Sequence, residues 1–267
     1  MSLITSHSNP KIKQARALRQ HKGRQGSGLF LVEGIRHVGE AIEAGVAIEW
    51  LYYAPNLLKS AFGRQLVESQ EQAGTPCYAL SSEAFASIAD KENPQGILAV
   101  VRQNPARLEQ LQPSNFDWGV ALVSPQDPGN LGTILRAIDA TGASGLILLN
   151  ESVDPYHPSA VRASMGALFW YPVASATFGE FAGWVNEHRY HVYGTSAHAS
   201  LDYRQVRSYA HPRILLMGSE REGLSAAQAA VCEQVIRLPM RGRATSLNLG
   251  VATGIFLYNM LATETAL

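Results

Sequence analysis

An asparagine and an arginine raise the question of chemistry in this sequence. They lie in "SPQDPGNLGTILRAIDATGASGLILLN", where an apolar strand is followed by a turn rich in Gly and Pro and then by a helix. Asn130 stands at the expected N-cap of this helix, and Arg136 lies off the apolar stripe that faces the core. A helix N-terminus offers free backbone N–H groups, and an exposed guanidinium adds a charged donor. The pattern predicts a site for a phosphate.

The glycine pattern of the turn does not fit the two common nucleotide-binding loops. A dinucleotide-binding fold needs Gly-x-Gly-x-x-Gly after the first strand and an acidic residue about 20 positions later. Here glycines occur only at 129 and 132, and the second strand ends at Asn150. The Gly-Lys-Ser/Thr of a Walker A loop is absent as well. A nucleotide-dependent oxidoreductase is therefore a disfavoured alternative.

Two later junctions between a strand and a helix also carry polar residues. "LLMGSEREGLS" runs from an apolar strand into Gly218, Glu220 and Gly223. "LPMRGRATSLNLGVATGIFLYNML" places a basic loop with Arg241 and Arg243 between a strand and a nearly all-apolar helix. Open α/β sheets bind ligands beyond the carboxyl ends of their strands, so we expect ligands at these junctions. The apolar helix must be enclosed by other elements or by a second subunit.

The elements that must position these residues fall into two α/β domains. The first domain, residues 1–104, alternates strands and helices, and the polar, Pro-containing stretch 105–117 is typical of a linker. In the second domain, residues 118–267, continuous apolar strands separated by helices predict a parallel sheet covered on both faces. The strands of the two domains are expected at 29–34, 48–54, 76–81 and 96–101, and at 119–124, 145–150, 191–196, 213–219 and 234–240.

Charge is balanced overall but uneven along the chain. The 267 residues hold 22 Lys and Arg against 22 Asp and Glu, so the total charge gives no argument for a nucleic-acid partner. Residues 1–32 contain basic residues and no acidic one, and between Ile4 and Arg24 a short amphipathic helix is expected to run into a basic, Gly-containing turn. Either this is a solvated helix face, or it binds RNA. The residues expected to contact RNA are Lys11, Lys13, Arg16, Lys22 and Arg24.

Several classes of protein are made improbable by what the sequence lacks. Its two cysteines, Cys77 and Cys232, form no CxxC pair, and its histidines have no metal-site spacing, so we expect no metal. The N-terminus has no apolar core, and the chain has no run of about 18 apolar residues. We expect no membrane segment and a cytoplasmic location.

The three junctions resemble the three sequence motifs of the SpoU/TrmH family of RNA 2′-O-ribose methyltransferases, in the SPOUT superfamily. The first motif, an Asn-x-Gly turn followed by an arginine, is matched by Asn130, Gly132 and Arg136. The second and third motifs are matched by Gly218, Glu220, Gly223 and Leu224, and by Leu238, Pro239, Met240, Ser246, Leu247 and Asn248. The stretch 157–173 is similar to the family's Arg-x-Ser-x-Gly-Ala segment. The first domain is similar to the ribosomal-protein-like (L30e-like) substrate-binding domain often fused upstream.

The resemblance implies a fold, an activity and a cofactor. The fold is a C-terminal α/β domain with a deep trefoil knot, in a homodimer built partly on the last helix. The activity is methyl transfer from S-adenosylmethionine to a ribose 2′-hydroxyl in structured RNA, with 23S ribosomal RNA favoured over transfer RNA. The alternatives are a tRNA 2′-O-methyltransferase and a non-catalytic RNA-binding or ribosome-assembly factor of the same fold. The residues expected at the cofactor are Thr195, Gly218, Leu238 and Leu247.

The resemblance also implies the catalytic residues, which are Arg136, Asn130, Glu220, Ser246 and Asn248. Family accounts make the arginine the general base. Because a guanidinium stays protonated in proteins, a phosphate clamp or stabilisation of the forming alkoxide fits Arg136 at least as well. The two asparagines and the serine would position the nucleotide and order Arg136, and Glu220 would orient Arg136 or a loop amide. Arg241 and Arg243 would contact RNA phosphate, or else lie in a solvated loop.

Overall fold

The computed structural model describes residues 3–265, which form two compact units. The first unit consists of the chain up to Asn104 together with Tyr156–Trp170, and the second of Pro105–Pro155 together with the chain from Tyr171 onward. Within residues 3–265, no helix combines the length and the apolar character needed to span a membrane.

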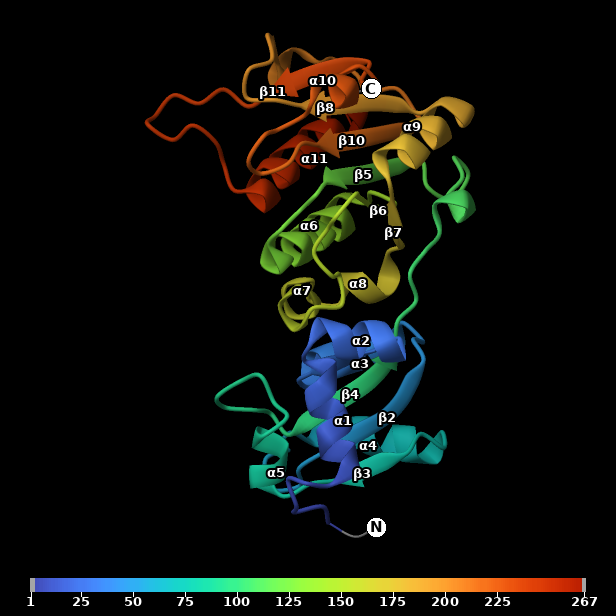
Figure 1. Cartoon of the computed structure of the whole chain (residues 1–267), viewed down its shortest axis with the longest axis vertical. Coiled ribbons are helices and arrows are strands. Elements are labelled where there is room, and N and C mark those ends of the chain that lie inside the picture. The colour runs from blue at the N-terminus through green and yellow to red at the C-terminus, as the bar shows by residue number, and fades with distance from the viewer. Residues whose placement is uncertain (1–2, 266–267) are drawn as a thin grey trace. The chain divides into compact units, whose positions relative to one another are not determined.

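The first unit is built on a four-stranded mixed sheet (Figure 1). Its order is β1-β4-β2-β3, in which β4 pairs antiparallel with β1 and β2, and β3 pairs parallel with β2. The strands are β1 (Leu29–Glu33), β2 (Ile48–Tyr53), β3 (Cys77–Ala79) and β4 (Ile97–Arg102). The helices before Asn104 are α1 (Pro10–Leu18), α2 (His21–Ser27), α3 (Ile35–Glu43), α4 (Ala61–Gln72) and α5 (Ser82–Ala86). Leu98 and Val100 of β4 share one core with Ile12 and Leu18 of α1.

Residues 4–24 were expected to form one short helix followed by a basic turn, but the structure has a second helix, α2, where the turn was expected. Asn9 caps the first turn of α1 with its side chain, and Pro10 takes the first helical position, so the helix begins only there. After α1 the chain turns, and α2 packs closely against its end. A Cβ on Gly23 would lie 2.0 Å from the Ala17 carbonyl oxygen, which only a glycine permits.

The second unit contains a seven-stranded sheet in which all paired neighbours are parallel, as the sequence predicts. The strand order is β7-β6-β5-β10-β8-β11-β9. The carboxyl ends of the strands therefore share one edge of the sheet. The strands are β5 (Trp118–Val123), β6 (Gly145–Leu149), β7 (Val173–Ala176), β8 (His191–Thr195), β9 (Leu201–Asp202), β10 (Arg213–Met217) and β11 (Gln234–Arg237).

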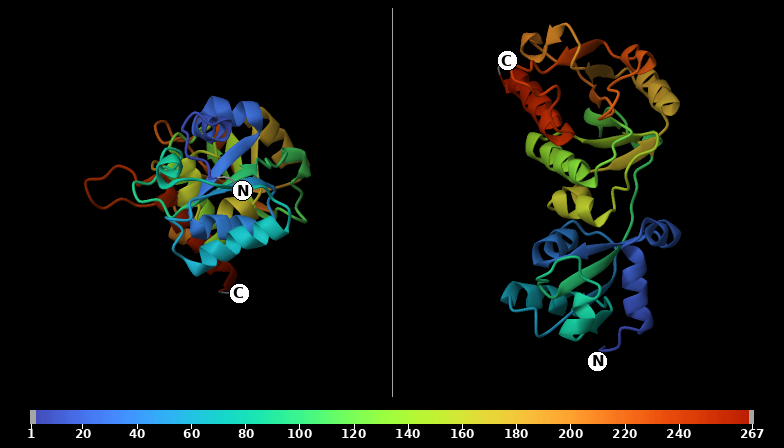
Figure 2. Two further views of the ribbon diagram at one scale, coloured as in Figure 1. Left: turned by 90° about the horizontal axis from the view of Figure 1, so that it is seen from below. Right: turned by 60° about the vertical axis from the view of Figure 1, so that its left-hand side comes forward.

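Helices cover this sheet, and the last one packs along the helix of the first motif. The longer helices are α6 (Pro128–Thr141), α9 (Phe178–Glu187) and α11 (Leu249–Thr265), and a short α10 spans Ala226–Ala229. α11 lies against α6, as Figures 1 and 2 show. Leu131, Ile134, Leu135 and Ile138 of α6 are fully buried, which is the stripe expected from their spacing. The trefoil knot that the family resemblance implies stays a prediction.

Residues 105–117, expected as a linker, pack into the second unit. The stretch contains a short 3₁₀ turn, Leu108–Gln110, and its side chains Leu108, Leu111 and Phe116 are buried. The indole N–H of Trp184 donates to the Leu111 carbonyl oxygen at 3.0 Å. Apolar side chains spaced among polar ones thus anchor a segment whose composition is typical of a loop.

A segment of the expected catalytic domain belongs to the first unit instead. It spans Tyr156–Trp170 and contains α7 (Pro158–Ala163) and α8 (Ala167–Trp170). The Tyr156 ring lies 4.8 Å from the Phe30 ring, centroid to centroid, and the Arg162 carbonyl oxygen lies 3.2 Å from His37 Nε2. The division of the sequence at 118 therefore differs from the structure, because these contacts hold α7 and α8 on β1 and α3.

The end of α11 is tied to the sheet by a buried arginine. Arg213, at the start of β10, is fully buried, and its guanidinium pairs with Glu264 near the end of α11. Arg213 also donates to the Tyr209 carbonyl oxygen at 3.2 Å and lies over the Trp118 ring, 4.2 Å from its centroid. Burial lowers the pKa of Arg213, and the Glu264 carboxylate opposes this shift. α11 is thereby fixed at its far end.

Candidate active site

Three loops of the second unit line one cavity beyond the ends of β8, β10 and β11. The cavity has a volume of about 770 Å³. All four residues that the resemblance implies for the cofactor line it: Thr195, Gly218, Leu238 and Leu247. Three of the implied catalytic residues line it as well: Glu220, Ser246 and Asn248. The structure thus brings residues of β8, the second motif and the third motif to one place.

Other lining residues were not predicted from the sequence. They include Ser196, His198, Met217 and Phe256. Ser196 and His198 directly follow β8, so the tendency of ligands to bind beyond strand ends would have found them. Phe256 carries no such signal, because it reaches the cavity from the middle of α11.

The second motif forms a tight loop that presents Glu220. Ser219 and Gly223 exchange two backbone hydrogen bonds of 3.0 Å each, and Gly223 has a positive φ of 69°. A Cβ on Gly218 would lie 2.4 Å from the Gly223 carbonyl carbon. Gly223 is therefore needed because its backbone has a positive φ, and Gly218 because a side chain there has no space.

A hydrogen-bonded link joins the three motifs. Asn130 Nδ2 donates to Glu220 Oε1 at 2.5 Å, and Asn248 Nδ2 donates to Asn130 Oδ1 at 2.7 Å. Asn248 Oδ1 accepts from the N–H groups of Gly250 and Val251 at 3.0 and 3.3 Å. Asn248 thus caps α11 while it holds Asn130, and Asn130 holds the loop of Glu220. The three side chains fix the relative positions of α6, α11 and the second-motif loop.

Asn130 is not the N-cap of α6, which corrects the prediction. The N-cap is Asp127, whose side chain accepts from the Asn130 N–H at 2.7 Å, and Pro128 takes the first helical position. An Asp-Pro pair is a strong signal for a helix start, and the carboxylate satisfies one of the free N–H groups. A phosphate at this helix end would meet the negative charge of Asp127, so the expected phosphate site at the α6 N-terminus is not supported.

Arg136 stands apart from the link. Its side chain is exposed on α6, and it is not among the residues that line the cavity. It makes no hydrogen bond or ion pair with any residue of the described range 3–265. Glu220 and the two asparagines bind one another, so their expected role of ordering Arg136 is absent from this structure. The guanidinium keeps its donors for a ligand.

Of the basic residues expected to contact RNA, some are exposed and others are held by contacts within the protein. Arg241 and Arg243 are exposed in the third-motif loop, and Lys13 and Lys22 are exposed on α1 and α2. Lys11 and Arg16 are half-buried: Lys11 Nζ lies 4.5 Å from the Trp50 ring centroid, and Arg16 Nε donates to the Ser87 carbonyl oxygen at 3.3 Å. Contacts within the protein therefore hold these two side chains.

Arg24 corrects the prediction, because it is buried, with 1% of its surface exposed. Its Nη1 donates to the carbonyl oxygens of Leu18 and Arg19 at 3.0 and 2.9 Å, where α1 ends. A cation at the last carbonyls of a helix satisfies them and matches the helix dipole. Arg24 is thus a structural cap of α1.

Burial raises the pKa of the Cys232 thiol, which lies behind β8, to about 11, so this thiol stays protonated at neutral pH. The Cys77 thiol is buried in the first unit, and burial raises its pKa to about 11 as well. Neither cysteine is therefore suited to act as a nucleophile. Among residues 3–265, no three side chains of His, Cys, Asp or Glu are grouped so that they could hold a metal ion.

The C-terminal part of the sequence matches a known family. Residues 117–258, more than half of the chain, match the model of the SpoU rRNA Methylase family. The chain belongs to this family. Residues 9–99 match the MRM3-like substrate binding domain. The protein is thus a SpoU methylase, an RNA ribose 2′-O-methyltransferase with an N-terminal substrate-binding domain, as its three motifs predicted.

Relatives of this SpoU methylase are similar over nearly its full length. A 23S rRNA (uridine(2479)-2′-O)-methyltransferase of Streptomyces viridochromogenes is 33% identical, over 96% of this chain and 90% of its own. The 23S rRNA (guanosine(2553)-2′-O)-methyltransferase RlmP of Bacillus subtilis is 29% identical, over 97% and 99%. The crystal structure of an AdoMet-bound rRNA methyltransferase from Sinorhizobium meliloti is 35% identical, covers 100% of this chain and 98% of that one, and superposes with a TM-score of 0.89.

Proposed function

We propose that this SpoU methylase transfers a methyl group from S-adenosylmethionine to a ribose 2′-hydroxyl of 23S ribosomal RNA, in the cytoplasm. The observation that carries the proposal is the link from Glu220 through Asn130 to Asn248, which joins all three motifs beside the cavity. Two relatives are named as 23S rRNA 2′-O-methyltransferases, and the similar crystal structure is named as AdoMet-bound. These names support the substrate and the cofactor.

The residues that line the cavity suit S-adenosylmethionine. Met217, Leu238 and Leu247 offer apolar surface for an adenine ring, while Thr195 and Ser219 bring hydroxyl and backbone groups that recognise polar edges. Carboxylates of the second-motif loop also line the cavity and complement a positive ligand. When bound, the cofactor supplies a methyl group on a positively charged sulfur. The protein's part is to hold this ligand and the ribose in line.

Arg136 acts by charge in this proposal. A guanidinium does not give up its proton at accessible pH, so it is a poor general base. It instead clamps a phosphate or ribose oxygen of the RNA and stabilises the negative charge that develops on the 2′ oxygen. Arg136 is exposed on α6, which packs against α11, the helix that follows the third motif. Its donors are therefore available to an RNA strand.

The function is tested with tritium-labelled methyl groups. Purified protein, labelled S-adenosylmethionine and in vitro transcribed 23S rRNA should give labelled RNA, and mapping of the 2′-O-methyl position identifies the nucleotide. Transcribed tRNA serves as the second substrate. Labelling of tRNA alone would replace 23S rRNA as the substrate, and RNA that binds without any label would make the protein a non-catalytic binding factor.

Gly218→Ala should weaken cofactor binding by about tenfold or more. The new methyl group meets backbone at 2.4 Å, so the second-motif loop must shift, at a cost of about 1–3 kcal/mol. Isothermal titration with S-adenosylmethionine measures the change. Gly183→Ala in α9 is the control, because a Cβ there meets nothing within 4 Å. Equal affinity of the two variants would show that the loop does not shape the cofactor site.

We also infer that the enzyme is a homodimer through α11. Val251 and Tyr258, seven residues apart on α11, are 50% and 54% exposed, and Leu247 before the helix is 39% exposed. Gly254 and Ile255 continue this stripe along a groove between α6 and α11. An apolar helix face of this kind supports pairing with the same face of a second copy, which buries it by two-fold symmetry.

Tyr258→Asp should shift the protein toward the monomer. A carboxylate on the proposed interface loses its hydration on association, and loss of a central aromatic contact raises the dimer dissociation constant about 30-fold or more. Sedimentation velocity over a concentration series measures the shift. Leu3→Asp is the control, because Leu3 is 52% exposed in the first unit. A wild-type protein that sediments as a monomer at all concentrations would contradict the inference.

A further inference from the structure

Two large aromatic rings are exposed beside helix α3 of the first unit. Phe62 of α4 is 54% exposed and Trp170 of α8 is 52% exposed, whereas the other three tryptophans of the chain are at most 8% exposed. A Cβ on Gly39 would lie 3.5 Å from the Phe62 ring. The Trp170 indole nitrogen lies 3.5 Å from a carboxylate oxygen of Glu40. The rings therefore stand beside adjacent positions of one helix.

The face of α3 between the rings points away from the core. His37, Val38 and Ala41 are the buried residues of this helix. Positions 36, 39, 40 and 43 lie on the opposite face, because a helix repeats every 3.6 residues. Gly39 has no side chain, so backbone forms the floor of this face. The result is a shallow surface with an aromatic ring at each side, here called the α3 face.

Positive charge gathers at the N-terminal end of the α3 face. Arg36 lies in the first turn, and Lys91 Nζ would be 3.6 Å from a Cβ on Gly34, the N-cap. Burial lowers the pKa of His37, and the charges of Lys91, Arg36 and Arg162 lower it further. The first turn contains no acidic residue, and Gly34 provides no side-chain cap, although Gln95 Oε1 accepts from the Ile35 N–H at 3.1 Å. Helix dipole and cations thus both favour an anion here.

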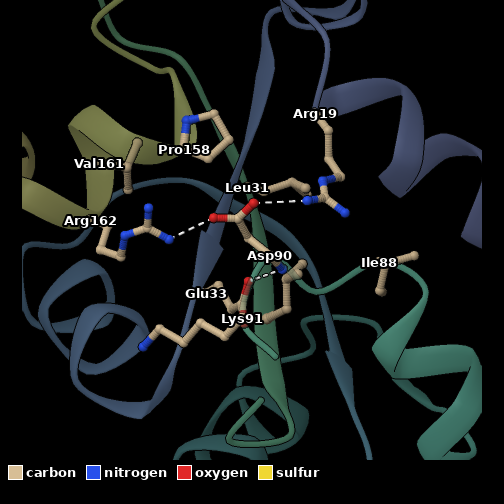
Figure 3. A pocket seen from close by; sticks show the side chains of 10 residues that line it. Arg19, Leu31, Glu33, Ile88, Asp90, Lys91, Pro158, Val161 and Arg162 are labelled. Atoms are coloured by element: carbon tan, nitrogen blue, oxygen red, sulfur yellow. Dashed lines mark hydrogen bonds and ion pairs between the residues drawn. The ribbon is translucent and has the colours of Figure 1, made fainter. Parts of the chain in front are cut away.

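Carboxylates hold part of this cluster in place without neutralising it. Asp90 pairs with Arg162 at 2.6 Å and with Arg19 at 2.8 Å, and its backbone N–H donates to Glu33 at 2.6 Å. Figure 3 shows the two guanidinium groups approaching Asp90 from different sides. The side chains of Arg162 and Arg19 remain 45% and 38% exposed. With Arg36 and Lys91, the cations outnumber these two carboxylates at the N-terminal end, whereas positions 40 and 43 of the α3 face carry Glu40 and Glu43.

We propose that the α3 face is a docking surface for unpaired nucleotides of the RNA substrate. The bases stack on Trp170 and Phe62. The phosphates lie toward Arg36, Lys91 and Arg162. This proposal rests on the proposed function. Single-stranded RNA is recognised by exposed aromatic rings beside cations, whereas a protein partner has no need of the phosphate-binding end.

Tryptophan fluorescence tests contact with Trp170 directly. Trp170 is the exposed tryptophan, so iodide should quench mainly its emission. Transcribed 23S rRNA should protect most of this iodide-accessible emission, and the protection should be absent from Trp170→Phe. Accessibility that RNA leaves unchanged would overturn the proposal. Protection that appears with rising protein concentration and no RNA would assign the face to a second copy and would overturn it as well.

Binding to 23S rRNA tests the contribution of each ring. Trp170→Ala and Phe62→Ala should each weaken binding, so that the dissociation constant for 23S rRNA rises about 5- to 100-fold, the range of one base–aromatic stack. Trp170→Phe should keep most of the affinity, and Leu3→Ala, which removes another exposed apolar side chain of the first unit, should change nothing. Thermal melts confirm that the variants are folded.

The outcomes separate this proposal from the proposed function. Wild-type protein that methylates 23S rRNA, with both alanine variants binding within about twofold of wild type, would overturn the docking surface alone. Wild-type protein that neither binds nor methylates 23S rRNA would overturn the proposed function. Loss of RNA affinity in the alanine variants, with S-adenosylmethionine affinity unchanged, is the expected result.

Discussion

Arg136→Ala should lower methyl transfer to 23S rRNA by roughly 10²–10³-fold, the usual effect of removing one donor that stabilises developing charge. The side chain lies outside the cavity and has no partner among the described residues, so its removal should leave the fold and the cofactor site unchanged. Single-turnover transfer rates measure the loss, and isothermal titration measures the affinity for S-adenosylmethionine. We expect the rate to fall while this affinity stays within about twofold.

Two further variants decide how Arg136 acts. Arg136→Lys keeps the charge and loses the planar fork, so a clamp on phosphate should recover part of the rate. Arg207→Ala removes another exposed arginine of the second unit and should have no effect. If the affinity for S-adenosylmethionine fell in proportion to the rate in Arg136→Ala, the residue would serve the cofactor, and its proposed role at the RNA would be wrong.

Glu264→Gln should destabilise the second unit by about 2–3 kcal/mol. Removing one partner of a buried ion pair costs about 3–5 kcal/mol because the other charge stays buried. We expect the lower value, since the Glu264 side chain is 36% exposed and water replaces part of its contribution. Arg213 is fully buried and would keep the Tyr209 carbonyl, the Trp118 ring and the more distant charge of Asp117. The thermal midpoint should fall by roughly 5–10 °C in calorimetry.

An exposed ion pair of the same unit provides the matched control. Glu233 pairs with His191, and both side chains are well exposed, at 47% and 38%. Glu233→Gln should therefore cost less than about 1 kcal/mol. Replacing Arg213 and Glu264 together by Met and Leu should recover much of the stability, because no unpaired charge remains. Equal shifts for Glu264→Gln and Glu233→Gln would show that burial of Arg213 does not govern the effect.

The parts predicted well from the sequence are those that depend on local patterns. Apolar runs predicted every strand of both sheets except the short β7 and β9, and the second and third motifs predicted residues that the structure brings to one cavity. The link among Asn130, Glu220 and Asn248 was beyond prediction from spacing, because it joins side chains 90 and 118 positions apart. The N-cap Asp127 was within reach, since an aspartate before a proline is a local signal.

The parts that the sequence concealed depend on tertiary contacts. Arg24 lies in a basic segment that predicts RNA binding, and only the packing of α2 on α1 shows that its guanidinium caps α1. The segment Tyr156–Trp170 lies within the stretch that matches the methylase family. The ion pair of its Arg162 with Asp90 nevertheless belongs to the first unit. Neither composition nor periodicity records which unit a short helix joins.

The assignment of Tyr156–Trp170 to the first unit has a consequence for synthesis. The chain passes between the units three times, after Asn104, Pro155 and Trp170. While the ribosome makes the protein, the first unit lacks α7 and α8 until residue 170 has emerged, and by then β5 and β6 of the second unit exist as well. Synthesis of the second unit therefore begins before the first unit is complete, unlike that of domains in simple succession. An exchange of the substrate domain between two such enzymes therefore requires two grafts.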